Sequence, residues 1–220
     1  MVEPDYTITE LNLSWTVLTK LPNDIDKYTN LKVLYCYNNN LTSLDNLPNG
    51  QLAGHEDKPL SLPSNLEKLY CTGNQITSLN NLPPNLKKLN CKFNKITSLD
   101  NLPPTLKELD CEYNEITSLD NLPHNLEKLN CRTNKITSLD NLPATLIILE
   151  CWNNNLTSLD NLPPNLKELH CSNNQITSLD NLPPKLEVLY CYQNPLIYNF
   201  EHTLENIRNY NASIMLSSNT

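Results

Sequence analysis

The segment LKKLNCKFNKITSLDNLPPT, residues 86–105, and the segment LKELDCEYNEITSLDNLPHN, residues 106–125, decide the fold. They belong to six consecutive blocks of 20 residues that begin at Leu66. In the LxxLxC part of each block, apolar residues alternate with polar ones, which predicts a short strand with one buried face. Because the block length is fixed, each strand is expected to pair in parallel with the next. The sequence therefore predicts an α/β repeat solenoid with one curved parallel sheet.

The repeat extends beyond these six blocks at both ends. A seventh block begins at Leu186 and leaves the pattern after Asn194, residues 31–48 match upstream, and a weaker first unit from Ile8 has Leu13 in place of the cysteine. Nine strands are expected. We interpret residues 1–220 as a single domain with these parts: an N-terminal cap and atypical first repeat at 1–30, a repeat at 31–48, an inserted loop at 49–62, regular repeats at 63–196 and a C-terminal cap at 197–220.

The segments between the strands contain Pro-Pro pairs, which favour extended, polyproline-like convex arms over helices. Both ends of a solenoid need caps, because they would otherwise expose apolar surface. Residues 21–31 have room for a helical turn beside Ile25 and Tyr28. A short C-terminal capping helix is expected after Asn199, its predicted N-cap. The apolar residues at helical spacing are Phe200, Leu204 and Ile207.

The pattern LxxLxCxxN followed by SLxxLP resembles the leucine-rich repeat, with cysteine in place of one consensus leucine. The resemblance covers about residues 8–196. The 20-residue length and the LP of the return arm are similar to the repeats of bacterial secreted effectors of the YopM and IpaH type. The cysteine, the asparagine-rich composition and the ending NPLIYNFEHTLENIRNYNAS resemble leucine-rich-repeat proteins of giant DNA viruses. The resemblance implies a horseshoe with the sheet on its concave face, in a viral or pathogen protein that engages host proteins.

The composition argues against several classes of function. Only 3 glycines in 220 residues disfavour glycine-rich phosphate loops, and a net charge of -8 repels nucleic acid. No segment approaches the roughly 18 consecutive apolar residues of a membrane span, and residues 1–10 lack the features of a signal peptide. We expect no nucleic-acid partner, no membrane partner and a cytoplasmic location, which by the resemblance includes the host cytoplasm.

The eight cysteines form one column. They are Cys36, Cys71, Cys91, Cys111, Cys131, Cys151, Cys171 and Cys191. Neighbouring strands would hold their Cβ atoms about 4.8 Å apart, farther than the roughly 3.5–4.5 Å of a disulfide, and a straight row cannot enclose a metal ion. We interpret them as buried free thiols, which implies a reducing compartment. No metal or cofactor site is expected.

Two polar columns accompany the cysteines. The first is Asn39, Asn74, Asn94, Asn114, Asn134, Asn154, Asn174 and Asn194, whose amides are expected to satisfy turn backbone groups of their own and adjacent repeats. The second is Asp100, Asp120, Asp140, Asp160 and Asp180. We interpret the aspartates as a solvated row that caps turns, with calcium binding as the alternative.

Outward-facing strand residues differ between repeats, and a partner would be specified there. In the centre of the sheet the charges alternate from strand to strand. The expected lateral sets are Lys88 with Glu108 and Lys128, and Lys92 with Glu112 and Arg132. These sets either neutralise one another along the sheet or contact a partner.

Aromatic and apolar residues occupy the two flanks of the same face. The candidate partner-binding residues are Tyr35, Tyr37, Tyr70, Ile148, Trp152, His170, Val188, Tyr190 and Tyr192. Aromatic anchors dominate the energy of many protein interfaces, although tyrosine also occurs in strands for its propensity alone. The loop at residues 48–61 is a second candidate surface.

No acid, base or nucleophile leaves the repeat pattern to form a convergent pocket, so no enzyme activity is expected. The function that remains is a non-catalytic protein–protein interaction module with a rigid concave face. Its protein partner is unknown, and we expect the chain to be a monomer. The alternative is a structural or self-assembling, virion-associated protein whose aromatic flanks contact copies of itself.

Overall fold

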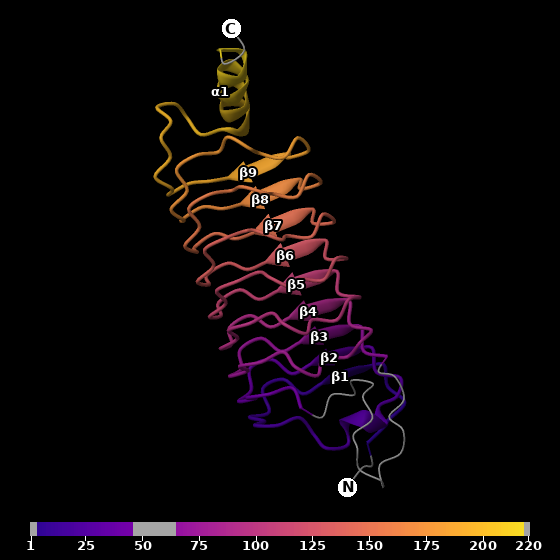
Figure 1. The fold of residues 1–220 in the computed structure, drawn as a ribbon. Coiled ribbons are helices and arrows are strands. Elements are labelled where there is room, and N and C mark those ends of the chain that lie inside the picture. Colours follow the sequence, from indigo (N-terminus) through magenta and orange to yellow (C-terminus); the bar gives the residue numbers. More distant parts are fainter. Residues whose placement is uncertain (1–3, 46–64, 218–220) are drawn as a thin grey trace.

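The computed structural model describes residues 4–45 and 65–217. Nine parallel strands form one sheet in chain order, as the repeat predicts (Figure 1). The strands are β1 (Glu10–Asn12), β2 (Val33–Tyr35), β3 (Lys68–Tyr70), β4 (Lys88–Asn90), β5 (Glu108–Asp110), β6 (Lys128–Asn130), β7 (Ile148–Glu150), β8 (Glu168–His170) and β9 (Val188–Tyr190). The loop predicted at residues 49–62 lies outside the described residues.

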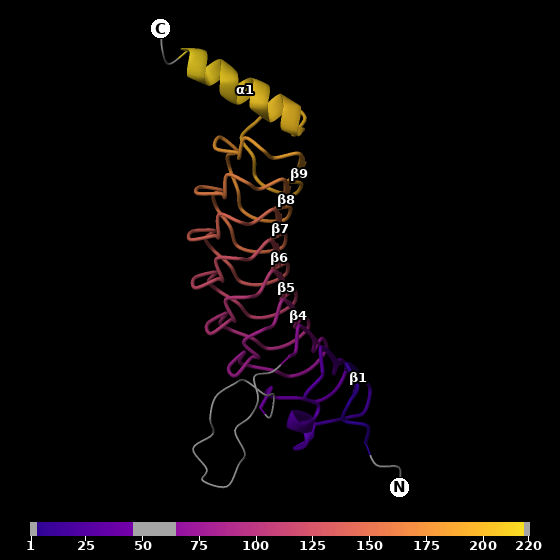
Figure 2. The ribbon, with the colours of Figure 1, turned by 90° about the vertical axis from the view of Figure 1, so that its right-hand side faces the viewer.

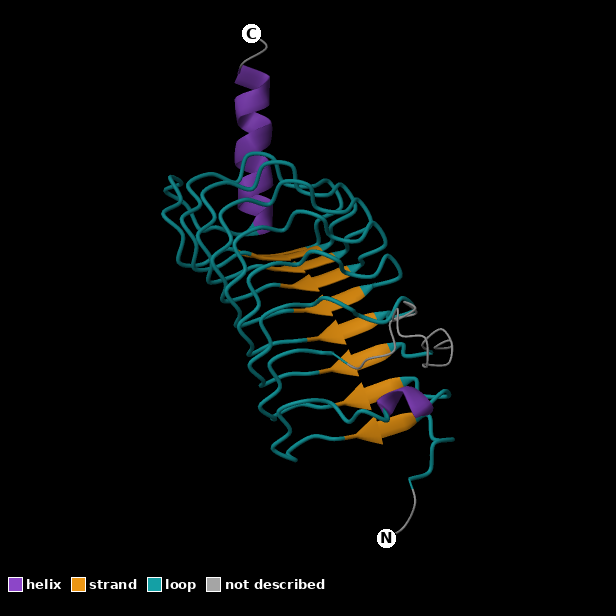
Figure 3. Ribbon diagram, turned by 60° about the horizontal axis from the view of Figure 1, so that its bottom comes forward, coloured by secondary structure: helices purple, strands orange, loops and turns teal. Residues whose placement is uncertain are grey.

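The strands pair without slippage, so that equivalent residues of successive repeats lie side by side. Leu89 of β4, for example, is paired with Leu109 of β5. The stack bends, and its strands line the inner side of the bend (Figure 2). Between residues 65 and 203 the return arms contain turns and loops but no helix (Figure 3), which confirms the prediction of mostly non-helical convex arms. No helix in the described ranges is long and apolar enough to cross a membrane.

The core is a set of apolar columns that run the length of the stack. In one repeat, Leu86, Leu89, Cys91 and Ile96 are fully buried. Burial of each such leucine or isoleucine contributes about 1.5–3 kcal/mol, and no single repeat could enclose these side chains without its neighbours. All eight cysteines are buried and free, which confirms the predicted column of reduced thiols.

The asparagine column fastens each repeat to the one before it. The Nδ2 of Asn114 donates to the carbonyl oxygens of Cys91 (3.1 Å) and Cys111 (3.0 Å). Its Oδ1 accepts a bond of 2.9 Å from the backbone N–H of Ile96. Asn74, Asn154 and Asn174 repeat this arrangement in their own turns. The predicted role of these amides is confirmed.

The aspartate column is also built into the turns. The Oγ of Ser118 donates to Asp120 Oδ2 (2.6 Å), and Asn141 Nδ2 from the next repeat donates to Asp120 Oδ1 (3.2 Å). These hydrogen bonds lower the pKa of the Asp120 carboxyl, and the bond from Ser118 has the largest effect. Asp100 and Asp140 have equivalent partners. Among the described residues, no group of three or more His, Cys, Asp or Glu side chains is arranged to hold a metal ion.

The N-terminal end carries the predicted helical turn. It is the 3-10 turn η1 (Ile25–Lys27), in which Ile25 is fully buried. Tyr28 packs beside it against the core and forms an edge contact with Tyr6, with ring centroids 4.9 Å apart. These side chains cover one end of the apolar columns.

The C-terminal cap differs from the prediction in where its helix begins. Helix α1 (Leu204–Ser217) starts five residues after Asn199, so the predicted N-cap is wrong. Thr203 takes that role, because its Oγ1 accepts a bond of 3.2 Å from the N–H of Asn206. The chain first crosses the end of the stack in an extended segment, where Tyr198 is buried and stacks on Phe200. The helix then lies obliquely across the end of the stack (Figure 2), where Ile207 is buried and Asn211 Nδ2 donates to Leu179 O at 2.9 Å.

Candidate functional site

The inner face of the bend is lined by the residues that alternate with the core. In β4 these are Lys88 and Asn90, followed by Lys92, while Leu89 and Cys91 between them are buried. Because all nine strands share this register, the sequence-predicted site residues lie in rows across the sheet. The rows form a central polar network and two aromatic flanks.

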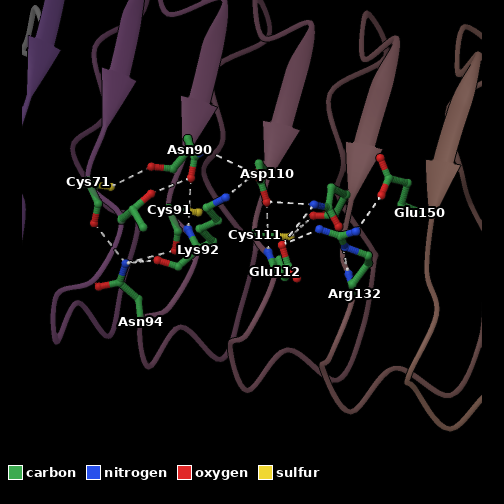
Figure 4. Close-up of polar contacts among 12 residues, drawn as sticks. Cys71, Asn90, Cys91, Lys92, Asn94, Asp110, Cys111, Glu112, Arg132 and Glu150 are labelled. Carbon is green, nitrogen blue, oxygen red and sulfur yellow. Dashed lines mark hydrogen bonds and ion pairs between the residues drawn. The ribbon is translucent and has the colours of Figure 1, made fainter. Parts of the chain in front are cut away.

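The centre of the network is Asp110, which lies between two asparagines from adjacent strands (Figure 4). Its Oδ2 accepts a bond of 3.1 Å from Asn90 Nδ2, and its Oδ1 accepts one of 3.1 Å from Asn130 Nδ2. Burial raises the pKa of the Asp110 carboxyl. These three side chains are hydrogen-bonded across the strands in the same register as the backbone. Their hydrogen bonds hold the side chains of this surface in one arrangement.

Arg132 connects this centre to the neighbouring strand (Figure 4). Its guanidinium lies 2.7 Å from Glu112 Oε2 and 3.2 Å from Glu150 Oε2. Burial acts to lower the pKa of Arg132, but the bond to Glu112 and the nearby carboxylates outweigh it, so that its pKa is raised. Glu112 has a side chain only 8% exposed, and the same guanidinium lies over the Trp152 ring at 5.2 Å. Trp152 therefore borders the central network.

The predicted lateral ion pairs are present, with one change of partner. Lys88 lies 2.6 Å and Lys128 lies 3.8 Å from the carboxylate of Glu108. Lys92 has its ion pair with Asp110 at 3.8 Å, rather than with the predicted Glu112. Side chains of β4 to β7, with Ile148 at one edge, surround an open hollow of about 360 Å³. Its positive and negative groups are paired, so the centre offers a shaped but nearly neutral surface.

The N-terminal flank is a compact group of tyrosines. The rings of Tyr35 and Tyr70 are stacked, with centroids 5.0 Å apart and planes at 12°. Tyr37 meets Tyr35 edge to face at 6.5 Å. All three are partly exposed. Burial is the main cause of a raised pKa at Tyr35.

The C-terminal flank is more open to solvent. Tyr190 and Tyr192 are 44% and 67% exposed, with centroids 6.3 Å apart, and Val188 lies beside them on the same strand. His170 contacts the Tyr190 ring edge to face at 4.5 Å, and its Nε2 lies 2.8 Å from Glu168 Oε1. The structure thus brings His170, Tyr190 and Tyr192 together, whereas the predicted Trp152 lies toward the centre.

A third aromatic group lies outside the predicted set. The second residue after each cysteine has a left-handed backbone, with φ between 51° and 66°. Asn38, Gly73, Asn153 and Asn173 suit this conformation, but the same position holds Phe93 and Tyr113. Their rings are 48% and 43% exposed and stacked at 4.5 Å and 14°.

This rim pair, Phe93 and Tyr113, is distinguished by its exposed, stacked rings and not by its backbone conformation, which Thr133 and Gln193 share. A left-handed conformation costs an ordinary residue about 1–2 kcal/mol, whereas one aromatic stack contributes about 0.5–1.5 kcal/mol. The signal was available in the sequence as two aromatic residues in adjacent repeats, in a column that otherwise holds Trp15 in the first unit and then glycine, asparagine, threonine and glutamine. It could be interpreted only once the backbone conformation was known.

The buried thiols have no access to a substrate. Burial raises the pKa of Cys36 and of Cys131 to about 12, so both remain protonated at neutral pH. Protonated, buried thiols are neither good nucleophiles nor metal ligands. The cysteine column therefore serves packing.

Comparison with known proteins gives a consistent result. The family description "Leucine Rich repeats (2 copies)" matches residues 64–104, 104–144, 145–184 and 164–209. None of the curated protein sequences compared matches the chain.

Several solved structures share the fold. YopM from Yersinia enterocolitica is 36% identical over 90% of this chain, with a TM-score of 0.75, and the chain spans 40% of its length. InlJ from Listeria monocytogenes, whose functional domain includes a cysteine ladder, is 35% identical over 91% of this chain and 47% of its own, with a TM-score of 0.64. A Shigella effector domain is 26% identical over 94% of this chain and 77% of its own, with a TM-score of 0.60.

Proposed function

Because the chain belongs to the leucine-rich-repeat family, we propose that it is a non-catalytic interaction module whose concave face binds another protein. Proteins of this family are generally binding scaffolds, and stacked repeats create extended concave surfaces. One observation carries the proposal. Two clusters of partly exposed rings flank a charge-paired network on a backbone held in register by nine strands.

The flanks supply the binding energy in this proposal. Aromatic side chains bury large areas and lose little entropy when they are already held in place, as the stacked Tyr35 and Tyr70 are. The central charges have partners in the free protein, so a new contact to them gains little. We propose Tyr35, Tyr37, Tyr70, His170, Val188, Tyr190 and Tyr192 as the main contacts, with Ile148 and Trp152 at the inner border.

Three observations support a function without catalysis. The thiols are buried and protonated, the carboxylate of Asp110 is held by two amides, and His170 is paired with Glu168. Catalysis requires an acid, base or nucleophile aimed at one point in a cleft. The thiols instead pack in the core, and Asp110 and His170 take part in the hydrogen bonding of the sheet surface.

We further propose that the partner is a host protein and that the chain works in a reducing compartment. Its likeness to YopM and to the Shigella effector domain supports the first point, and the column of free thiols supports the second. The chain spans only 40% of the YopM chain, so this proposal is limited to the binding surface and does not extend to the whole activity of YopM.

Affinity capture from eukaryotic cytosol tests the proposal. One bait carries Tyr190→Asn and Tyr192→Ser, and a second carries Tyr35→Asn and Tyr70→Asn. Asparagine and serine occur at the equivalent positions of other repeats, so these baits should fold normally. A third bait, Lys185→Gln on a return arm, is the matched control.

A protein retained by the natural chain and by the control, but lost with either flank variant, supports binding at the concave face. Equal retention by all baits excludes the flanks. Light scattering of the purified chain tests the alternative function, which is self-assembly. A molecular mass that increases with protein concentration in the natural chain, but not in the flank variants, would show self-assembly.

A further inference from the structure

The rim pair Phe93 and Tyr113 lies in the turns that follow β4 and β5, beside the concave face and outside the proposed contact set. We propose that this rim is a docking surface for an acidic protein segment that carries an aromatic side chain. The inference goes beyond the proposed function, because it uses other residues and specifies the chemistry of the partner.

The rings are held in a rigid frame. The backbone N–H of Phe93 donates to Glu112 O at 3.0 Å, and that of Tyr113 donates to Arg132 O at 3.0 Å. The Nδ2 of Asn94 closes the first turn by donating to Cys91 O at 2.9 Å. A rigid aromatic group that is already exposed can accept a partner without an ordering cost.

The stack is open at the Phe93 end. The equivalent residue of the preceding repeat is Gly73, which contributes no side chain. The Oδ1 of Asn38 takes the place that a Cβ of Gly73 would occupy. A ring from a partner would extend the stack and lie next to this amide, which offers it a hydrogen-bonding neighbour.

The charged residues next to Phe93 in the sequence determine which sign of charge a partner would need. Lys92 and Lys95 flank the ring in sequence, and Lys92 has its ion pair with Asp110 at 3.8 Å, so that Lys95 is the cation left for a partner. Across the described ranges no carboxylate lies within ion-pair distance of Lys95, whose Nζ is 3.5 Å from the amide oxygen of Gln75. The two acidic residues beside Tyr113, in contrast, are already paired.

Those acidic residues are Glu112, which pairs with Arg132, and Glu115, which lies 2.9 Å from Lys135. The row Lys95, Glu115 and Lys135 therefore has one more positive than negative charge, in a protein whose net charge is -8. A basic segment would gain nothing from Lys95, whereas a segment with aspartate or glutamate beside its aromatic residue would pair with it.

Selection from a displayed library of random 12-residue peptides tests the proposal with the full chain as bait. Enriched peptides are synthesised and their affinities are measured by calorimetry. The rim variant is Phe93→Asn with Tyr113→Asn, which suits the backbone because Asn153 and Asn173 adopt the same left-handed conformation. The matched control is Tyr190→Asn with Tyr192→Ser on the concave face. A second variant, Lys95→Gln, removes the free cation and leaves both rings in place.

We expect the enriched peptides to hold one aromatic residue beside at least one acidic residue. Their affinity should fall by roughly tenfold or more with the rim variant and by about threefold with Lys95→Gln, and it should not change with the control. Basic consensus peptides, no enrichment, or equal affinity for the rim variant and the natural chain would overturn the proposal. Peptides lost only with the control would support the concave site and contradict the rim site, so the two proposals fail separately. Should the rim double variant unfold, Lys95→Gln alone decides.

Discussion

Raising the pH above 9 should lower the free energy of unfolding, because the buried cysteines resist ionisation. The size of this effect can be calculated for Cys131. Burial raises the pKa of Cys131 from 9.0 to about 12. A thiol with a raised pKa in the folded state keeps its proton after the unfolded chain has lost it. The stability that it contributes is therefore complete below pH 9 and is lost progressively as the pH rises toward 12.

The size of the effect follows from these two values. At pH 10 the unfolded thiol is mostly ionised while the folded one is not, which favours unfolding by about 1.4 kcal/mol relative to pH 8. Cys36, which has the same raised pKa of about 12, should contribute equally. Burial also raises the pKa values of the five other deeply buried thiols, which add to the loss.

Urea unfolding of the natural chain and of Cys131→Ala, in reductant at pH 7, 8, 9 and 10, isolates the contribution of one thiol. Cys131→Ala should cost about 1 kcal/mol at neutral pH because it removes a buried atom. This difference should change by about 1.4 kcal/mol between pH 8 and pH 10, since the variant has one thiol fewer to ionise. The deficit should therefore disappear, and Cys131→Ala should be slightly more stable than the natural chain at pH 10. The exposed-side variant Ser172→Ala should follow the natural chain at every pH. A deficit that stays constant up to pH 10 would refute the argument from burial.

Three further outcomes are expected. All eight thiols should react with a disulfide reagent after denaturation without reductant, and almost none at pH 8 in the folded chain; fast labelling of the folded chain would contradict the burial of the column. Asn114→Ala should lower the free energy of unfolding by about 1–3 kcal/mol in a urea titration, because it leaves buried backbone groups unpaired, while Asn125→Ala in an exposed turn should change little. Arg132→Met should cost about 3 kcal/mol by leaving Glu112 buried without its partner, and a loss no larger than that of Lys107→Met would show that this pair is no stronger than an exposed one.

Most of the fold could be predicted from the sequence because every repeat has the same pattern of apolar and polar residues. The strand that contains Leu89 and the hydrogen bonds of the Asn114 amide depend only on their own repeat and its neighbours. A structure inferred for one repeat can therefore be assigned to the equivalent residues of the next. The start of α1 could not be found in this way. Tyr198 fills the end of the core before any helix begins, and this contact outweighs the helix-starting preference of Asn199.

The candidate site was predicted in part. The rows of the concave face follow from the alternation of side chains, but the exchange of partner by Lys92 depends on the reach of a long side chain in three dimensions. Phe93 and Tyr113 were missed because a turn residue gives no periodic signal of exposure. Their conformation and their stacking became visible only in the folded chain.

The in-register stack also determines how the protein would respond to force. The hydrogen bonds between strands run along the long axis of the solenoid, so a pull on its two ends loads them one strand at a time. A repeat freed from the end of the array would pass from one strand spacing to an extended chain, a gain of about 65 Å for its 20 residues. Under tension the molecule should lengthen from its ends, with equal steps through the regular 20-residue repeats, and the turns of the rim pair would be among the last to open.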